Sequence, residues 1–332
     1  MAEATIYDVA TRAGVSISTV SHTLNRPHRV NADTRRRVLD AIEELGYVPR
    51  ATAVARARQS VGRVGVLAPF TSYASYNRRL MGILKEAEGD ATEIVVYDQQ
   101  SVAAAPSPLL SSLPVTRRVD GLLIMGLPLD DALTERLISQ RLPTVLIDST
   151  RPELDSITID DEAAGQLVGR HLIQRGRRSI AYVSEAQVST AYVSPGQRRR
   201  AGVARALADA NLDPTALRHV ATTADIAGGR AAVRRLLADG ELPDAVFAHQ
   251  DVVAAGVLLE CRDRGVRVPE DVAIVGFDQT ELSEALDLTT VWQPLEESGR
   301  LGFRQLREAI GGAPVTPRHV TLGVRLVARS TS

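Results

Sequence analysis

Apolar residues in the first 25 positions recur at the spacing of two short helices. In IYDVATRA, Ile6, Val9 and Ala10 fall on one helical face, and in SISTVSHTLN, Val20 and Leu24 are one helical turn apart. Most of the other positions are polar, so each helix has one face to bury and one to expose. The pattern predicts a pair of helices joined by a tight turn.

The residues that flank these helices carry capping and turn signals. Thr5 and Ser16 each precede a helix and can accept hydrogen bonds from its first N–H groups, and Gly14 suits a positive φ in the turn. The N-terminal end of the second helix would expose small polar side chains, which suit the major groove of DNA. An ordinary helical hairpin is the alternative, because helix-turn-helix patterns are common by chance. The exposed residues are Ile17, Ser18, Thr19, Ser21 and His22.

A third helix is predicted over residues 30–45, VNADTRRRVLDAIEEL. Asn31 can cap its start, Gly46 can end it, and three arginines occupy positions 35–37. Three helices of this length make a compact headpiece. The apolar stripe of the third helix consists of Val38, Ile42 and Leu45.

From residue 61 onward, apolar runs typical of buried strands alternate with helical patterns. This alternation predicts a doubly wound α/β body, with one group of strands before about residue 160, a second group after it, and 289–294 crossing back. The three prolines in 101–114 predict an irregular loop. The expected strands are 63–69, 93–98, 120–126, 143–148, 156–160, 179–184, 245–249 and 272–278, and helical patterns lie at 78–88, 163–175, 198–210, 228–238 and 252–263.

Composition and charge narrow the function further. The 332 residues are 44% hydrophobic and 24% charged, as in globular proteins. No apolar run reaches the roughly 18 residues that a membrane span needs, and the first residues have no features of a secretory leader, so a cytoplasmic location is expected. The net charge is −1, yet residues 1–60 hold nine arginines against six acidic residues, a local +3. A basic headpiece on an acidic body is the distribution expected if only the headpiece meets phosphate. Cys261 is the only cysteine, and no Cys/His cluster has metal-ligand spacing, so no disulfide, metal or cofactor is expected.

Three consecutive patterns together resemble a known family. The order IYDVAxxAGVSxxTVSxxLN, then VxxxTRxxVxxAIEELGYVP, then an Ala/Arg-rich hinge is similar to the LacI/GalR family of bacterial transcription regulators. The match is nearly continuous over 5–50 and strong again over 265–300. The resemblance implies a helix-turn-helix headpiece over 1–49, a hinge helix or linker over 50–60, and an effector-binding and dimerisation domain over 61–330. That domain would be type I periplasmic-binding-protein-like, with lobes of about 61–159 with 292–320, and 160–290 with 321–330.

The resemblance also implies which residues contact DNA. Ile17, Ser18 and His22 would face base edges, and the hinge, with Ala53 and Arg56, would enter the minor groove. Arg56 stands where the family has a wedging leucine, so either Arg56 reads the minor groove through its charge without wedging, or the central kink is shallower. A flexible linker is the alternative for the whole segment. Other residues, at the capped helix ends and nearby positions, would contact the DNA backbone and its phosphates. They are Thr5, Tyr7, Ser16, Thr19, Ser21, Asn25, Asn31, Thr34 and Tyr47.

Polar and aromatic residues at the carboxyl ends of the strands are the candidates for effector binding. Carboxylates and a guanidinium beside aromatic rings suit a polyhydroxylated ligand, because they bind vicinal hydroxyls while a ring stacks on the sugar face. For each aspartate, helix capping is the alternative. The candidates are Phe70, Tyr73, Tyr76, Met125, Asp148, Arg199, Asp251 and Asp278.

These observations favour a homodimeric or tetrameric repressor that binds a pseudo-palindromic DNA operator and responds to a small effector. A sugar is the favoured effector, and a purine or other metabolite is the alternative. The sequence offers no nucleophile with a base beside it, so it does not indicate an enzyme. Two other classes, a solute-binding protein and a cytoplasmic sugar-processing enzyme, would share the α/β body, but the headpiece argues against both.

Overall fold

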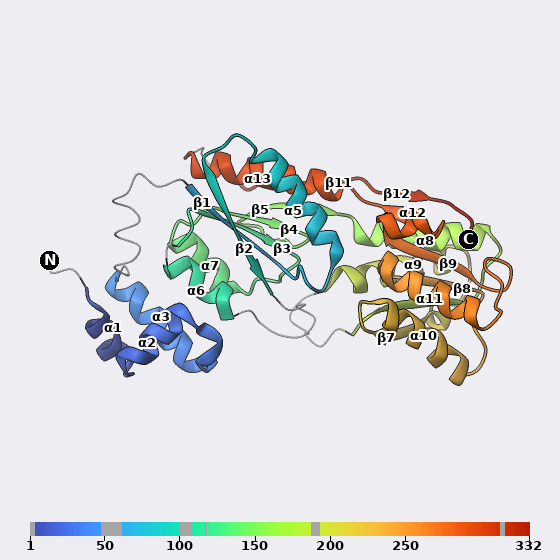
Figure 1. Ribbon diagram of the computed structural model, residues 1–332, viewed down its shortest axis with the longest axis horizontal. Coiled ribbons are helices and arrows are strands. Elements are labelled where there is room, and N and C mark those ends of the chain that lie inside the picture. Colours follow the sequence, from blue (N-terminus) through green and yellow to red (C-terminus); the bar gives the residue numbers. More distant parts are fainter. Residues whose placement is uncertain (1–3, 48–61, 100–107, 117, 187–192, 313–315) are drawn as a thin grey trace. The chain divides into compact units, whose positions relative to one another are not determined.

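The computed structural model describes residues 4–47, 62–99, 108–116, 118–186, 193–312 and 316–332 (Figure 1). The chain divides into two compact units, each built from separate stretches of sequence. The first unit comprises Met1–Ala68, Leu84–Ser156 and Gly302–Arg318, and the second comprises Pro69–Ile83, Ile157–Leu301 and His319–Ser332. The hinge predicted over 50–60, with Ala53 and Arg56, lies outside the described residues.

The N-terminal end of the first unit contains the predicted three helices. They are α1 (Ile6–Ala13), α2 (Ile17–Asn25) and α3 (Ala32–Leu45), and a 3₁₀ turn, η1 (Pro27–Arg29), lies between the last two. Their apolar faces form one cluster, so the helical periodicity of the sequence identified the buried positions correctly. The fully or nearly fully buried members in the headpiece are Val9, Ala10, Ala13, Val20, Leu24, Val38, Leu39, Ala41 and Ile42.

The capping and turn predictions for these helices are confirmed. Thr5 and Asp8 form a capping box at the start of α1, and the Ser16 side chain accepts a hydrogen bond from the Thr19 N–H at the start of α2. Gly14 and Gly46 both adopt left-handed backbone conformations, with φ of 64° and 60°. Local sequence therefore defines the ends of the headpiece helices without help from distant residues.

One of the two sheets has six strands in the order β11-β5-β4-β3-β1-β2, and β1 to β4 lie in the first unit. Strands β1 to β4 pair in parallel, as their continuous apolar sequences predicted. The strands are β1 (Gly62–Ala68), β2 (Thr92–Asp98), β3 (Gly121–Met125), β4 (Thr144–Ile147), β5 (Asp155–Ile159) and β11 (His319–Leu322). The helices of this part of the sequence are α6 (Pro108–Thr116) and α7 (Asp131–Ser139), together with α5 (Ala74–Glu86), most of which belongs to the second unit.

The helix α6 corrects the loop expected over 101–114. Pro108 occupies its first turn, where a missing N–H has no intrahelical partner to lose. Pro114 lies inside the helix, but the helix extends only to Thr116, so the single lost hydrogen bond falls near its end. The proline count therefore predicted the wrong conformation for 108–114, and residues 101–107 lie outside the described part of the chain.

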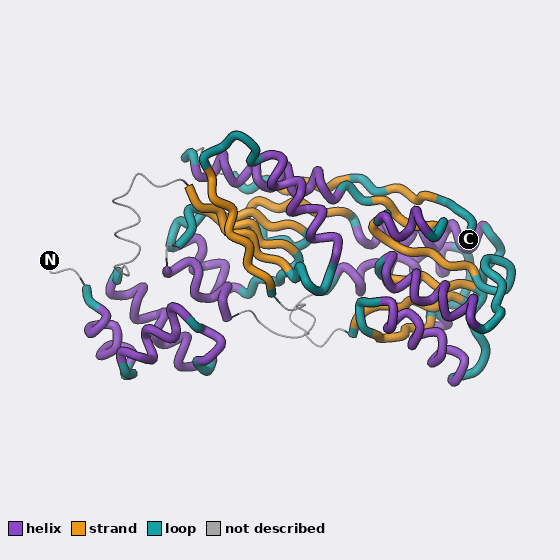
Figure 2. The backbone as a smooth tube through the Cα atoms, in the orientation of Figure 1, coloured by secondary structure: helices purple, strands orange, loops and turns teal. Residues whose placement is uncertain are grey.

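The second unit is built on another six-stranded sheet, with the order β12-β10-β9-β8-β6-β7 (Figure 2). Its central strands pair in parallel, and β12 runs antiparallel to β10. The strands are β6 (Ile180–Glu185), β7 (Arg218–Thr222), β8 (Ala245–Ala248), β9 (Ala273–Asp278), β10 (Thr289–Trp292) and β12 (Arg325–Val327). The helical elements are α8 (Asp161–Gln174), α9 (Pro195–Asp209), η2 (Pro214–Ala216), α10 (Ile226–Ala238), α11 (Asp251–Asp263), α12 (Glu281–Ala285) and α13 (Leu295–Ile310).

Alternate residues of these strands face two separate cores. Ala181 and Val183 pack with α10 and α11, which lie side by side in Figure 1, whereas Tyr182 packs with α8 and α9 on the opposite face. Phe247 of β8 and Phe277 of β9 share the face of Tyr182. The strand register therefore brings three aromatic rings to the side of the sheet that α9 covers.

Among the described residues, none of the helices combines the length and the apolar character that a membrane span requires.

Candidate functional site

The exposed face of α2 carries the residues predicted to face DNA bases. Ile17 is 40% exposed although it is apolar, and Ser18 and His22, one helical turn apart, are also exposed. The Ser16 hydroxyl lies 2.8 Å from the hydroxyls of both Ser18 and Thr19, so the start of the helix is held by its own side chains. Ile17, Ser18 and His22 are thus available for a partner as the sequence predicted.

Several residues predicted to hold phosphate also have structural roles. The Thr5 hydroxyl and N–H both donate to the Asp8 carboxylate, at 2.7 and 2.8 Å, and this bonding holds the pKa of Asp8 below its usual value. Asn31 caps α3 by accepting from the Thr34 N–H at 2.8 Å. Tyr7 is 67% exposed, whereas Tyr47 is half-buried against the headpiece core. The side chain of Asn25 lies outside the described part, and Ser21 is half-buried.

The arginines at the start of α3 are partly engaged within the headpiece. Arg35 donates through Nη1 to the carbonyl oxygens of Pro27 and Val30, at 3.3 and 3.1 Å, and burial lowers its pKa. Arg36 pairs with Asp33 across one turn of the helix at 3.1 Å. The local positive charge is therefore less available to a partner than the arginine count suggests.

A buried ion pair lies at the centre of the candidate effector site in the second unit. Nε of Arg199, in α9, donates to Oδ1 of Asp161, in α8, at 2.8 Å, and the two side chains are only 7% and 6% exposed. The guanidinium carbon lies 3.4 Å from the centroid of the Phe277 ring, and Nη1 donates to the His249 carbonyl oxygen at 3.1 Å. Burial alone would lower the pKa of Arg199, but the charge of Asp161 raises it above its usual value.

Two glycines explain how the chain brings Arg199 beside Asp161. A Cβ atom on Gly165 would lie 2.0 Å from the Arg199 carbonyl oxygen, and one on Gly202 would lie 2.0 Å from the Glu162 carbonyl oxygen. The helices α8 and α9 therefore cross with their backbones in direct contact. No other residue type fits at this crossing, so the glycines position the ion pair.

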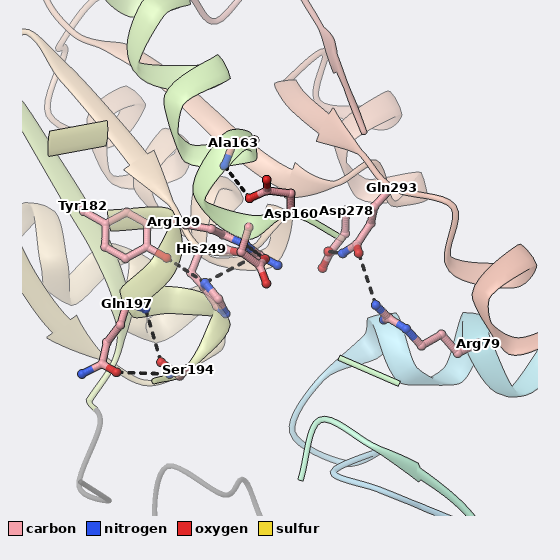
Figure 3. A network of polar contacts seen from close by, with 11 residues as sticks. Arg79, Asp160, Ala163, Tyr182, Ser194, Gln197, Arg199, His249, Asp278 and Gln293 are labelled. Carbon is pink, nitrogen blue, oxygen red and sulfur yellow. Dashed lines mark hydrogen bonds and ion pairs between the residues drawn. The ribbon is translucent and has the colours of Figure 1, made fainter. Parts of the chain in front are cut away.

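An acidic group with an unusual environment lies at the end of β9. Gln293 donates through Nε2 to Oδ1 of Asp278 at 2.5 Å, and Nη2 of Arg79 donates to Oε1 of the same glutamine at 3.2 Å (Figure 3). Asp278 has a φ of 106°, rare for a residue with a side chain, and is 5% exposed. Burial raises its pKa to about 7, although the charge of Arg199 opposes this shift.

The structure gives Asp251 a role that needs no ligand. Its Oδ2 accepts from the Thr280 N–H and hydroxyl, at 2.7 and 2.9 Å, and its Oδ1 accepts from the Thr290 hydroxyl at 2.6 Å. The side chain is fully buried, and burial raises its pKa to about 6. Asp251 therefore anchors the turn that follows Asp278, and its contact with an effector stays a prediction.

The remaining effector candidates divide between the two units. In the second unit, Tyr73 and Tyr76 pack edge to face with centroids 6.0 Å apart, Phe70 is buried, and the Tyr73 hydroxyl donates to the Glu185 carboxylate. In the first unit, Asp148 follows β4 with a φ of 60°. Met125 is fully buried at the end of β3, where it packs within the sheet, and its contact with an effector stays a prediction.

Sequence reasoning missed several members of the site. Asp161, Tyr182, Gln293 and Arg79 were not among the candidates, whereas His249 stands at the end of a predicted strand, which identifies it as a cleft residue, but it was not included in the candidate set. Tyr182 lies inside an apolar run and Arg79 inside a helix, so only the strand register and helix packing place them here. Among the described residues, no cluster of His, Cys, Asp and Glu could hold a metal ion.

Comparisons with known proteins find matches for both the three-helix headpiece and the α/β body. Residues 5–50 match the family "Bacterial regulatory proteins, lacI family", and residues 170–332 match "Periplasmic binding protein-like domain". The chain is 33% identical to catabolite control protein A of Priestia megaterium over 99% of both proteins. It also resembles the solved structure of a complex of the transcriptional regulator CelR with cellobiose, with 28% identity, a TM-score of 0.72, and coverage of 99% of this chain and all of the other.

A Lac repressor dimer bound to operator and the anti-inducer ONPF is similar over 99% of both chains, with 27% identity and a TM-score of 0.69. The headpiece and the α/β body thus occur together, in the same order, across full-length relatives. The chain belongs to the lacI family of bacterial transcriptional regulators.

Proposed function

We propose that this protein is a homodimeric, effector-controlled repressor that binds a pseudo-palindromic operator and responds to a neutral sugar or related polyhydroxylated compound. The exposed face of α2, with Ile17, Ser18 and His22, supports the DNA-binding part of the proposal. A two-fold symmetric dimer would present two such faces to two half-sites. The similarity to a Lac repressor dimer bound to operator supports the same arrangement.

The Arg199–Asp161 pair is the observation that supports the choice of a neutral effector. The charge of Arg199 is already met by a buried carboxylate, and one face of its guanidinium is covered by Phe277. A phosphate or carboxylate would have to compete with Asp161, at the cost of leaving that carboxylate buried without its partner. A hydroxyl group can accept from the guanidinium without disrupting the pair.

Asp278 adds a second group that can bind a hydroxyl of a neutral effector. A carboxyl group with a pKa of about 7 can be ionised or protonated near neutral pH, and in either form it bonds a hydroxyl. Gln293 fixes the carboxyl orientation, which favours one arrangement of hydroxyls over others. Binding would then favour one conformation of the protein over another and so change the affinity for the operator.

Selection of duplexes from a random library, at a stated near-physiological salt concentration, tests the DNA-binding part. We expect recovery of a pseudo-palindrome of roughly 14–20 base pairs. Recovery of no motif, both without sugar and with a panel of neutral sugars, would contradict it.

The recovered duplex then becomes the probe for the effector class. Neutral mono- and disaccharides should include compounds that shift operator affinity at least tenfold, whereas their phosphorylated counterparts should not. A response confined to phosphorylated or carboxylated compounds would overturn the proposed class. The direction of the shift identifies the effector as inducer or corepressor.

A further inference from the structure

His249 lies between the ion pair and the aromatic face of the sheet. It directly follows β8, and its N–H donates to the Val183 carbonyl oxygen at 2.8 Å while its own carbonyl accepts from Arg199. The backbone is therefore held at both ends of the residue. Figure 3 shows the imidazole beside Arg199, joined by dashed lines to Tyr182 and Arg199.

The contacts of the ring define which nitrogen carries the proton. Nδ1 of His249 lies 2.8 Å from the Tyr182 hydroxyl, which is 1% exposed and has no other hydrogen-bond partner among the described residues. Nη1 of Arg199, which can only donate, lies 3.4 Å from the same nitrogen. Because the guanidinium can only donate, Nδ1 accepts in this contact, and the Tyr182 hydroxyl, which can donate or accept, then donates to the same nitrogen. The single proton of a neutral imidazole is then on Nε2.

The surroundings also keep the ring neutral. Burial and the neighbouring charge of Arg199 hold the pKa of His249 well below its usual value. The carboxylate that pairs with this guanidinium, Asp161, accepts from Arg199 Nε at 2.8 Å. The His249 ring thus remains a one-proton group throughout the neutral range.

The Nε2 side of the ring is the side left for a ligand. No described residue is within hydrogen-bond distance of Nε2, and the residue is partly exposed. On the Nδ1 side, the ring packs against the first turn of α9, where a Cβ atom on Gly196 would lie 3.5 Å from Cε1 and Nδ1. The Tyr182 contact and this glycine therefore orient the ring through its Nδ1 edge, and Nε2 has no hydrogen-bond partner among the described residues.

We propose that His249 is a specificity residue of the effector site, in which a Tyr182-oriented imidazole donates an Nε2–H hydrogen bond to an oxygen atom of the effector. This inference rests on the proposed effector function of the second unit. It adds a chemical requirement: the effector must place an acceptor oxygen opposite His249. A compound with only a donor group at that position is rejected, because two N–H groups would face each other.

The tautomer is tested first, without any ligand. The full-length protein labelled with ¹⁵N-histidine contains six histidines, and the H249Q variant identifies the signals of His249 in long-range ¹H–¹⁵N spectra. We expect His249 to be the Nε2–H tautomer, and Y182F to shift it toward a mixture of tautomers. A protonated Nδ1, or a doubly protonated ring at pH 7, would overturn the proposal.

The second test compares two variants that differ in one property. H249Q keeps an N–H donor near the position of Nε2, whereas H249M has similar length and no donor. The probes are cellobiose, D-ribose and a panel of neutral sugars, measured by calorimetry. For a sugar that binds the wild type, H249M should bind roughly tenfold more weakly and H249Q within about threefold of the wild type. Thermal unfolding establishes that both variants are folded.

The outcomes separate this inference from the proposed function. Wild-type affinity in a folded H249M variant would overturn the role of His249 while leaving the sugar response intact. Failure of every neutral sugar to bind the wild type would instead contradict the proposed effector class. In that case the tautomer spectrum alone decides whether His249 presents its Nε2–H.

Discussion

Gly165 of α8 lies so close to Arg199 of α9 that a Cβ atom on this glycine would come within 2.0 Å of the Arg199 carbonyl oxygen. The contact joins a packing constraint to the chemistry of the site, because the same crossing brings Arg199 to Asp161. A helix shift that accommodates a methyl group must also move the ion pair.

Gly165→Ala should therefore destabilise the protein by at least about 2 kcal/mol, through overpacking at a backbone contact. Chemical unfolding measures the change in the free energy of unfolding. Gly323→Ala is the matched control, since nothing lies within 4 Å of a Cβ atom there, and it should change stability by less than about 0.5 kcal/mol. Equal effects of the two substitutions would show that α8 and α9 are not tightly packed.

Asp161→Asn should cost about 3–5 kcal/mol, because it leaves the Arg199 guanidinium buried without its carboxylate. The exposed pair of Arg205 and Asp209, with side chains 66% and 43% exposed, provides the control: Arg205→Ala should cost less than about 1 kcal/mol. Urea unfolding of both variants checks the prediction. A cost for Asp161→Asn as small as that of the control would mean that water reaches the pair.

Asp251→Asn should lower the free energy of unfolding, whether or not a ligand is present. An amide would turn an N–H group toward one of the donors from Thr280 and Thr290, so we expect a loss of about 2–3 kcal/mol. Thr290→Val removes one of those donors and should cost less. Thermal unfolding of the two variants gives the comparison. A fully stable Asp251→Asn variant that has lost its response to effector would support the direct ligand contact predicted from the sequence.

Asp278 should make the protein less stable as the pH rises. Its pKa is raised by burial from 3.8 to about 7, so between these values the folded protein holds a proton that the unfolded chain has released. This contribution is complete below about pH 4 and is lost as the pH rises through 7. Asp278→Asn should reduce the difference in the free energy of unfolding between pH 5 and pH 8 by about 2–3 kcal/mol. An unchanged difference would contradict the raised pKa of Asp278.

His22→Ala should alter base preference at one position in each half-site, because His22 is exposed one turn after Ser18 on the face of α2 that the proposal assigns to DNA. Repeating the duplex selection with the variant measures the change. A uniform loss of affinity with no altered preference would assign His22 to the phosphates instead.

The headpiece could be predicted from the sequence almost completely. Its caps and turns depend on residues within three or four positions of each other, such as Thr5 with Asp8 and Asn31 with Thr34, and its core follows helical periodicity. Most of the parallel strands were equally clear, because strands buried on both faces are continuous apolar runs. By contrast, β7, β11 and β12 were missed, and their half-exposed sequences explain why.

The candidate effector site could be predicted only in part. Arg199 and Asp278 were identified from the ends of elements, but the partners that define their chemistry are distant in sequence: Asp161 and Phe277 for Arg199, Gln293 for Asp278. Asp251 and Met125 also stand at element ends, and they are turned inward. Position at the end of a strand does not distinguish a side chain that faces a ligand from one that packs internally.

Each of the two sheets takes an edge strand from the last part of the chain: β11 lies beside β5, and β12 beside β10. Since β11 and β12 span residues 319–327, neither sheet can be completed until the ribosome has made nearly all of this sequence. The buried members of the headpiece core lie within residues 9–42, except for Val115 of α6. During synthesis, the three-helix headpiece can therefore fold long before either sheet of the α/β body is complete.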